Sequence, residues 1–235
     1  MPSNASHAVV NRLLAALPRD EYKRLVPELT PIAITFGEVL YEPGDRIKHV
    51  YFPNDSIISL LSAMSERSTL EVGMVGSEGM AGLSVFAGVN VSLTRAIVQG
   101  AGTAMRMSAA VVRQEANRLG PFHKLLHRYS HSLQSQVSQS SACNRFHSVN
   151  DRLARWLLMT SDRLGTDEFR LTQEIMSNML GVRREGVNQA AGTLQSAKLI
   201  RYSRGMITIL NRGRLRVNAC ECYSIIKAES DQYLN

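Results

Sequence analysis

One stretch, from Leu171 to Ile200, constrains the fold of this chain more than any other part of it. It reads LTQEIMSNMLGVRREGVNQAAGTLQSAKLI. Apolar residues at helical spacing stand on both sides of Gly181, so the pattern predicts a short helix, a tight turn and a second helix. Thr172 is placed to cap the first helix, because its hydroxyl can accept a hydrogen bond from a free backbone N–H.

The segment that follows, LIRYSRGMITIL, predicts two short strands around a turn at Ser203-Arg204-Gly205. Helix, turn, helix and hairpin together predict a winged helix-turn-helix, and the alternative is a helical hairpin with a solvated charged face. Charge favours the first interpretation. Between Arg145 and Arg216 the chain has 13 Lys and Arg against 6 Asp and Glu, which accounts for the whole net charge of +7. Positive charge confined to one region indicates a polyanionic partner for that region.

The start of the second helix, predicted over residues 183–197, carries side chains that can read bases. Arg can donate to guanine, Asn or Gln can bond adenine, and Glu can accept from cytosine. Recognition helices touch base edges with their first turns. Phosphate contacts are expected from Arg204 at the hairpin tip and from the region of Thr172. Such contacts position the protein on DNA without specifying sequence. The predicted DNA-binding residues are Thr172, Arg183, Arg184, Glu185, Asn188, Gln189 and Arg204.

The N-terminal half has a different pattern. Apolar residues at helical spacing between Val9 and Val26, divided by Pro18, predict two short helices. From Pro31 to Met107, short β-branched runs alternate with turn signals at a spacing of roughly 8 to 12 residues. This spacing predicts an antiparallel sandwich or a small barrel.

A long helix is predicted after Gly120-Pro121, where no Gly or Pro interrupts the chain as far as Leu164. It breaks near His147-Ser148, because Ser148 can cap a new helix. A narrow apolar stripe favours a homodimer seam of the coiled-coil kind, and the alternative is an ordinary core-facing helix. A helix of about 40 Å is long for packing on one small β domain, which favours the seam. The predicted dimer contacts are Phe122, Leu126, Tyr129, Leu133, Gln136 and Ser140.

These motifs together resemble the Crp/Fnr-type bacterial transcription regulators. The stretch quoted first resembles their DNA-binding region, FGEVLYEPGD and HVYFPNDSIISLL resemble the start of their cyclic-nucleotide-binding-type β-roll, and RFHSVNDRLARWLL resembles their hinge. The resemblance covers residues 28 to 217, nearly the whole chain. It implies an α+β fold with an N-terminal antiparallel β-roll (a double-stranded β-helix), a long dimerisation helix and a C-terminal winged helix-turn-helix.

The resemblance also implies domain boundaries. We expect N-terminal helices in residues 1–29, a β-roll sensor domain in 30–118, a dimerisation helix in 119–147, a winged helix-turn-helix in 148–217 and a helical C-terminal tail in 218–235.

The effector is less well indicated. Family members that bind cAMP hold its phosphate with a Gly-Glu pair and with an Arg followed by Ser or Thr, and meet adenine with a Thr-Ser pair on the long helix. Here Glu78 precedes Gly79, Ala96 follows Arg95, and Ser138 follows a valine. The pattern does not support cAMP, and it leaves open another nucleotide, another small molecule or no ligand. These five residues form the candidate effector pocket.

The sequence predicts no metal site. Cys220 and Cys222 are too few for structural zinc, which usually needs four ligands. The cluster that Fnr-type members hold on N-terminal cysteines is excluded, because no cysteine precedes Cys143. Three histidines recur every four residues on one helical face: His123, His127 and His131. This spacing can bind a metal or haem, and the alternative is that the three are ordinary polar residues of an exposed face.

Enzymes are disfavoured because the sequence contains no Walker loop, no GxSxG motif and no evident nucleophile–base pair. It has no apolar run near the roughly 20 residues that span a bilayer and no signal-peptide pattern, so we expect a cytoplasmic protein. The predicted function is a sequence-specific transcription regulator that binds double-stranded DNA as a homodimer on a palindromic operator. An activator of this kind would also contact RNA polymerase. The alternative is a nucleotide-binding signalling module whose basic domain contacts another acidic partner.

Overall fold

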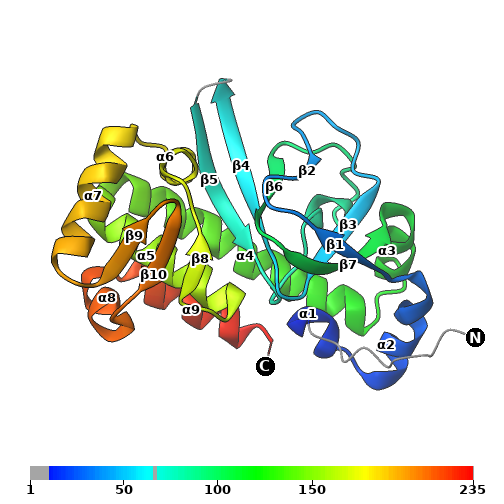
Figure 1. Ribbon diagram of the computed structural model, residues 1–235. Helices are drawn as coiled ribbons and strands as arrows, with labels where there is room; N and C mark the ends of the chain where they lie inside the picture. The colour runs from blue at the N-terminus through cyan, green and yellow to red at the C-terminus, as the bar shows by residue number, and fades with distance from the viewer. Residues whose placement is uncertain (1–10, 66–67, 235) are drawn as a thin grey trace, which may run out of the picture.

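The computed structural model describes residues 11–65 and 68–234, which form a β-rich N-terminal half and a helical C-terminal half joined by a long helix (Figure 1). Val9, which the sequence placed in the first helix, lies outside the described residues. No helix of the described residues is both long and apolar enough to cross a bilayer.

The N-terminal half begins with two short helices, as predicted. Pro18 stands directly before the second helix, where its fixed φ and missing N–H cost nothing. The elements that follow are mostly strands. In order, they are α1 Arg12–Ala15, α2 Arg19–Leu25, β1 Thr30–Ile34, β2 Val39–Tyr41, β3 His49–Pro53, β4 Ile57–Ser65, β5 Ser68–Val75, β6 Arg95–Gly100, β7 Gly102–Ser108 and α3 Ala109–Ala116.

The strands form two antiparallel sheets that pack face to face. One sheet has the order β1-β7-β3 and the other the order β2-β6-β4-β5. Their inner faces meet in a core that includes Ile34, Ile58 and Val98, each almost fully buried. The hairpin of β4 and β5 extends beyond the sheets towards the C-terminal half (Figure 1). The antiparallel β domain predicted from the spacing of turn signals is therefore confirmed.

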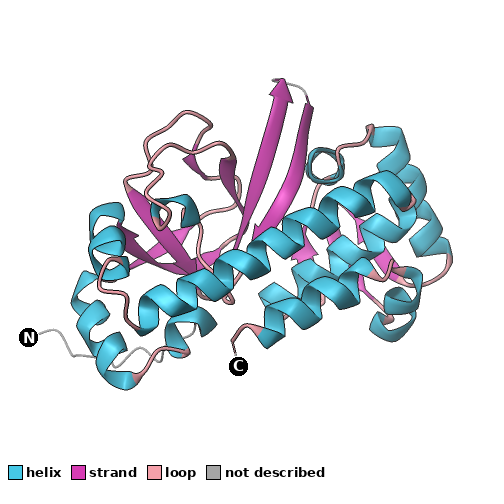
Figure 2. Cartoon of the chain, turned by 180° about the vertical axis from the view of Figure 1, so that it is seen from behind, coloured by secondary structure: helices cyan, strands magenta, loops and turns pink. Residues whose placement is uncertain are grey.

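The long helix α4, Pro121–Phe146, runs along the back of the molecule (Figure 2). It ends at His147, and Ser148 caps α5, Val149–Leu164, by accepting a hydrogen bond from Asp151 N. Gly165 ends α5 in the left-handed conformation, with φ of +66°.

The C-terminal half packs its helices around Trp156 and the apolar side of α7. A strand that the sequence analysis missed, β8, pairs with β10 and completes a small sheet of order β8-β10-β9. The elements are β8 Glu168–Arg170, α6 Gln173–Leu180, α7 Arg184–Ser196, β9 Ile200–Ser203, β10 Met206–Ile209, α8 Arg212–Asn218 and α9 Cys222–Gln232. Helix α9 lies beside α4, so the C-terminal tail covers part of the long helix (Figure 2).

Candidate nucleic-acid interface and effector pocket

The two-helix motif forms where the sequence predicted it. The Thr172 hydroxyl accepts a hydrogen bond from Ile175 N at 3.3 Å and so caps α6. Gly181 ends α6 with φ of +62°, and a Cβ there would approach Leu70 Cδ1 to 2.9 Å. Glycine is therefore required both by the backbone conformation and by close packing against β5. These constraints fix the angle at which α7 begins.

Helix α7 is sharply two-sided. Val187, Ala190, Ala191 and Leu194 are buried against α5 and α6. The opposite side of its first turns is fully accessible, because every predicted reading residue there is exposed: Arg183, Arg184, Glu185, Asn188 and Gln189. We call these five exposed side chains the reading face.

The wing lies next to the start of α6. Arg204 and Gly205 have φ of +51° and +76°, so the tip of the hairpin has the left-handed backbone of a two-residue turn. Leu171 N donates to Gly205 O at 2.7 Å and holds the tip beside Thr172.

An ion pair connects the start of α6 with the start of α7. Arg184 lies 3.1 Å from Glu174, and both side chains are more than half exposed. A surface pair of this kind contributes little stability. Arg184 can therefore exchange this partner for another acceptor at small cost.

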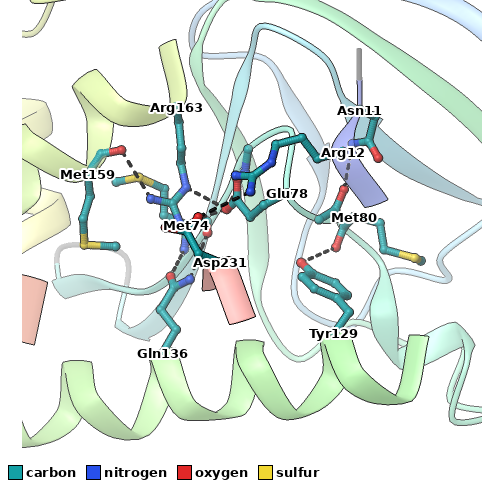
Figure 3. A network of polar contacts seen from close by, with 12 residues as sticks. Asn11, Arg12, Met74, Glu78, Met80, Tyr129, Gln136, Met159, Arg163 and Asp231 are labelled. Atoms are coloured by element: carbon teal, nitrogen blue, oxygen red, sulfur yellow. Dashed lines mark hydrogen bonds and ion pairs between the residues drawn. The ribbon is translucent and has the colours of Figure 1, made fainter. Parts of the chain in front are cut away.

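The predicted dimer seam packs inside the chain instead. Phe122 and Leu126 are fully buried against the N-terminal helices and β3. Tyr129 OH donates to Met80 O at 2.9 Å, while Gln136 accepts from Met74 N at 2.6 Å and donates to Met74 O (Figure 3). Ser140 is also buried, and Leu133 is the member of the stripe that stays partly exposed. The seam prediction is wrong for the buried residues because the N-terminal helices, the β domain and α9 cover this side of α4 within the chain.

The opposite face of α4 is polar and contains small residues. The exposed positions of α4 are Pro121, Lys124, His127, Arg128, His131, Gln134, Ser138, Ser141, Ala142, Arg145 and Phe146, of which Phe146 is a large apolar residue. Val137, beside Ser138, is half-buried.

The residues of the candidate effector pocket do not gather in one cavity. Glu78 forms a buried ion pair with Arg163 of α5 at 2.8 Å. Arg95 pairs instead with Glu42 at 2.7 Å, and Ala96 is buried between the sheets. Gly79 packs against the Tyr129 ring, where a Cβ would come within 2.5 Å. Ser138 is exposed on α4. Ion pairs within the chain engage its two charged members, Glu78 and Arg95, and the shared effector pocket stays a prediction.

A different cavity, of about 380 Å³, opens between η2 (Leu83–Val85), the loop after it and α4. Its walls are mainly apolar, with Phe86, Leu93 and Leu133 among them, and hydroxyls come from Ser92, Thr94 and Ser130. None of the described residues that line it is Lys or Arg. The cavity therefore lacks the cation that a phosphate would need.

The histidines on α4 have protein partners. His123 Nδ1 lies 2.8 Å from Ala116 O, and His131 lies 3.6 Å from Glu229. Phe86 contacts the edges of His123 and His127. Among the described residues, none of these three belongs to a group of potential metal ligands.

The cysteines, in contrast, gather at one point. Cys143 at the end of α4 lies 3.4 Å from Cys220, measured between their Sγ atoms, and all three thiols are buried. Cys222 Sγ lies 3.5 Å from His147 Nδ1. A hydrogen bond with Cys220 and the charge of Arg155 lower the pKa of the Cys143 thiol. The sequence analysis counted only Cys220 and Cys222 as possible ligands and missed this cluster, because its two halves are far apart in the sequence.

Comparison with known proteins identifies the helix-turn-helix domain and the overall fold. Residues 151–217 match the family model of the Crp-like helix-turn-helix domain. A Crp/Fnr-family regulator of Eubacterium rectale superposes with a TM-score of 0.68 at 19% identity, covering 88% of this chain and 96% of that one. FixK2 of Bradyrhizobium japonicum gives 0.70 at 15% identity, with 82% and 98% covered. The c-di-GMP-responsive regulator CLP of Xanthomonas campestris gives 0.65 at 14% identity, with 82% and 99% covered. No curated protein sequence matches the chain at a significant level.

Proposed function

This chain has the fold of the Crp/Fnr-type regulators and a Crp-like helix-turn-helix domain, and we propose that it is a sequence-specific DNA-binding transcription regulator of the bacterial cytoplasm, not an enzyme. The observation that carries the proposal is the reading face. An exposed row of two Arg, a Glu, an Asn and a Gln opens α7, while the other side of that helix is buried. These are the side chains that distinguish base pairs in the major groove.

Each residue of the reading face has a proposed contact with DNA. Arg184 and Glu185 contact base edges, Gln189 follows one turn later, and Arg183 and Asn188 share base or phosphate contacts. Thr172 and Arg204, which lie close together where the wing meets the start of α6, contact phosphates. The ion pair of Arg184 with Glu174 holds the guanidinium near its working position before DNA is bound.

The active form is a homodimer that joins through the exposed face of α4. Val137 and Leu133 supply partly exposed apolar contacts, and Ser138, Ser141 and Ala142 are small enough to let a second helix approach. Val91 and Leu93, on the loop beside this face, are 46% and 86% exposed. A two-fold dimer imposes its symmetry on the operator, so the bound site is an imperfect palindrome.

The effector, where one is used, occupies the cavity beside Leu133 and is a largely apolar molecule without phosphate. The support for this is the apolar lining and the absence of Lys and Arg among the described lining residues. A cyclic nucleotide is disfavoured because Ala96, and not Ser or Thr, follows Arg95, and because Glu78 precedes Gly79.

Selection of bound duplexes from a random DNA library tests the function. The wild type is expected to enrich one palindromic motif, and a variant with Arg184→Ala and Gln189→Ala is expected to enrich a degenerate one. A Lys198→Ala variant, which changes an exposed cation outside the reading face, serves as the matched control and is expected to select the wild-type motif. Failure of the wild type to enrich any sequence would favour the alternative, a signalling module with another acidic partner.

A further inference from the structure

We propose that Cys143, His147, Cys220 and Cys222 form a structural zinc site. One ligand atom from each residue can be chosen so that all of them lie within 4.8 Å of one another. The site is independent of the DNA-binding assignment, because it lies at the hinge and not on the reading face.

The spacing of the ligands suits one tetrahedral ion. Zinc bound by sulfur at about 2.3 Å places neighbouring ligand atoms about 3.8 Å apart. The separations of 3.4 Å between Cys143 and Cys220, and of 3.5 Å between Cys222 and His147, are close to that value. An iron–sulfur cluster would spread the same residues over several metal atoms. Three thiolates and one imidazole are a donor set that structural zinc sites use.

The backbone holds these ligands in place from two directions. Cys143 and His147 stand one helical turn apart, so both face the same side at the end of α4. Cys220 and Cys222 come from the segment that leads from α8 into α9. The ion would therefore join the long helix, the hinge and the C-terminal helix at a single point.

Groups around the cluster supply the outer contacts that metal ligands normally have. His147 presents Nδ1 to the thiols, and its Nε2 lies 3.2 Å from the Glu221 carboxylate. A carboxylate on the far nitrogen of a ligating histidine orients the ring and raises its basicity. Gln139 Nε2 donates to Cys222 Sγ at 3.1 Å, as amide donors do around bound thiolates.

The charges also favour an occupied site. Three thiolates and a divalent ion leave one negative charge on the site. Arg152 and Arg155, early in α5, are each 6% exposed, and their Nε atoms have no hydrogen-bond partner among the described residues. Buried cations require a nearby anionic partner, and both guanidinium charges act on Cys143, so a zinc–thiolate site would supply that partner.

Metal content and cobalt spectroscopy test the proposal on the full chain without reference to DNA. Protein purified in reducing buffer without a histidine tag is expected to contain about one zinc per chain. Exchange of that zinc for Co²⁺ is expected to give the intense visible bands of tetrahedral cobalt and a thiolate-to-cobalt charge-transfer band. Cys143→Ser and Cys222→Ser are expected to lose the metal and the bands, and His147→Ala is expected to change the visible bands.

His127→Ala is the matched control, since it removes an exposed histidine of the same helix outside the cluster. It is expected to keep zinc and the cobalt spectrum. Circular dichroism of each variant shows whether α4 and the rest of the fold persist. The proposal is overturned if the reduced wild type has three free thiols and binds neither zinc nor cobalt. It is also overturned if the folded Cys143→Ser,Cys222→Ser double variant keeps the cobalt bands. A third contradicting result is a purified wild type that contains a Cys143–Cys220 disulfide and no bound metal.

Discussion

The Trp156 indole donates a hydrogen bond of 2.9 Å from Nε1 to Glu71 Oε1, so a residue of the helix-turn-helix half contacts a carboxyl group of the N-terminal β domain. The other oxygen of Glu71 accepts from Ser59 Oγ at 2.6 Å. A second link follows close by, since Gln99 Nε2 donates to Thr160 Oγ1 at 3.1 Å. Polar contacts thus connect β5 and β6 with α5.

Burial of Glu71 should make the stability of this junction depend on pH. It raises the pKa of Glu71 from 4.5 to about 7, because desolvation outweighs the two hydrogen bonds. The folded chain therefore keeps a proton that the unfolded chain releases. The resulting stabilisation is complete below about pH 4.5 and is lost as the pH rises through about 7.

Glu71→Gln should remove that dependence. The free energy of unfolding of the wild type, relative to the variant, should fall by up to about 3 kcal/mol between pH 5 and pH 8. Urea unfolding of both proteins across this range measures the difference. Parallel curves at every pH would show that Glu71 is ionised in the folded state throughout.

The ion pair between Glu78 and Arg163 should be a strong constraint between the two halves. Both side chains are about nine-tenths buried. Arg163→Ala would leave the Glu78 carboxylate buried without its counter-ion, so we expect a loss of about 3–5 kcal/mol in the free energy of unfolding. The Glu78→Gln,Arg163→Ala double variant should recover part of the loss, because it no longer buries a charge. A double variant as unstable as the single one would show that the guanidinium acts through packing alone.

Dimerisation should depend on the exposed face of α4. Val137→Asp places a charge at the proposed contact, where burial without a partner costs several kcal/mol, and it should sediment as a folded monomer. Leu126→Asp should unfold the chain instead, since Leu126 is fully buried within it. Ser224→Asp, on the exposed side of α9, is the matched control and should remain dimeric. A wild type that is already monomeric at micromolar concentration contradicts the dimer proposal.

The contact between Glu221 and His147 should strengthen the binding of zinc at the proposed site. Glu221→Gln removes the carboxylate 3.2 Å from His147 Nε2 and should weaken zinc binding by about tenfold. Competition with a chromophoric chelator measures the affinity. Glu229→Gln, which alters the carboxylate facing His131, is the control. Equal zinc affinities of the two variants would show that Glu221 does not contribute to zinc binding.

Local chemistry explains what the sequence predicted well. Thr172, Gly181 and the Ser203-Arg204-Gly205 turn act within a few residues, so caps and turns of the two-helix motif could be read directly. Residue types at the start of α7 likewise indicated a reading face before its exposure was known. The apolar stripe of α4 could not be assigned in this way, because a periodic pattern marks a buried face without identifying what covers it.

The cysteine cluster was missed for a related reason. Cys220 and Cys222 stand 77 and 79 residues beyond Cys143, and their meeting depends on how α9 returns along α4. The i,i+4 spacing of Cys143 and His147 was the one sequence feature that could have indicated a metal site. Two ligands are too few for structural zinc, so the spacing is informative only when Cys220 and Cys222 are known to lie nearby. The ion pairs of Arg95 and Glu78 could not be predicted either, since their partners, Glu42 and Arg163, come from other segments.

The most direct test of the central claim is binding of Arg184→Ala and Arg204→Ala to the selected operator and to a scrambled duplex at several salt concentrations. Arg184→Ala should cost roughly 1–3 kcal/mol on the operator and relax preference at one base pair per half-site, with little effect on the scrambled duplex. Arg204→Ala should weaken binding to both duplexes and lower the salt slope by about one per subunit. If Arg184→Ala weakens binding to both duplexes equally, Arg184 contacts phosphate only. If neither variant changes binding, the start of α7 does not read DNA sequence.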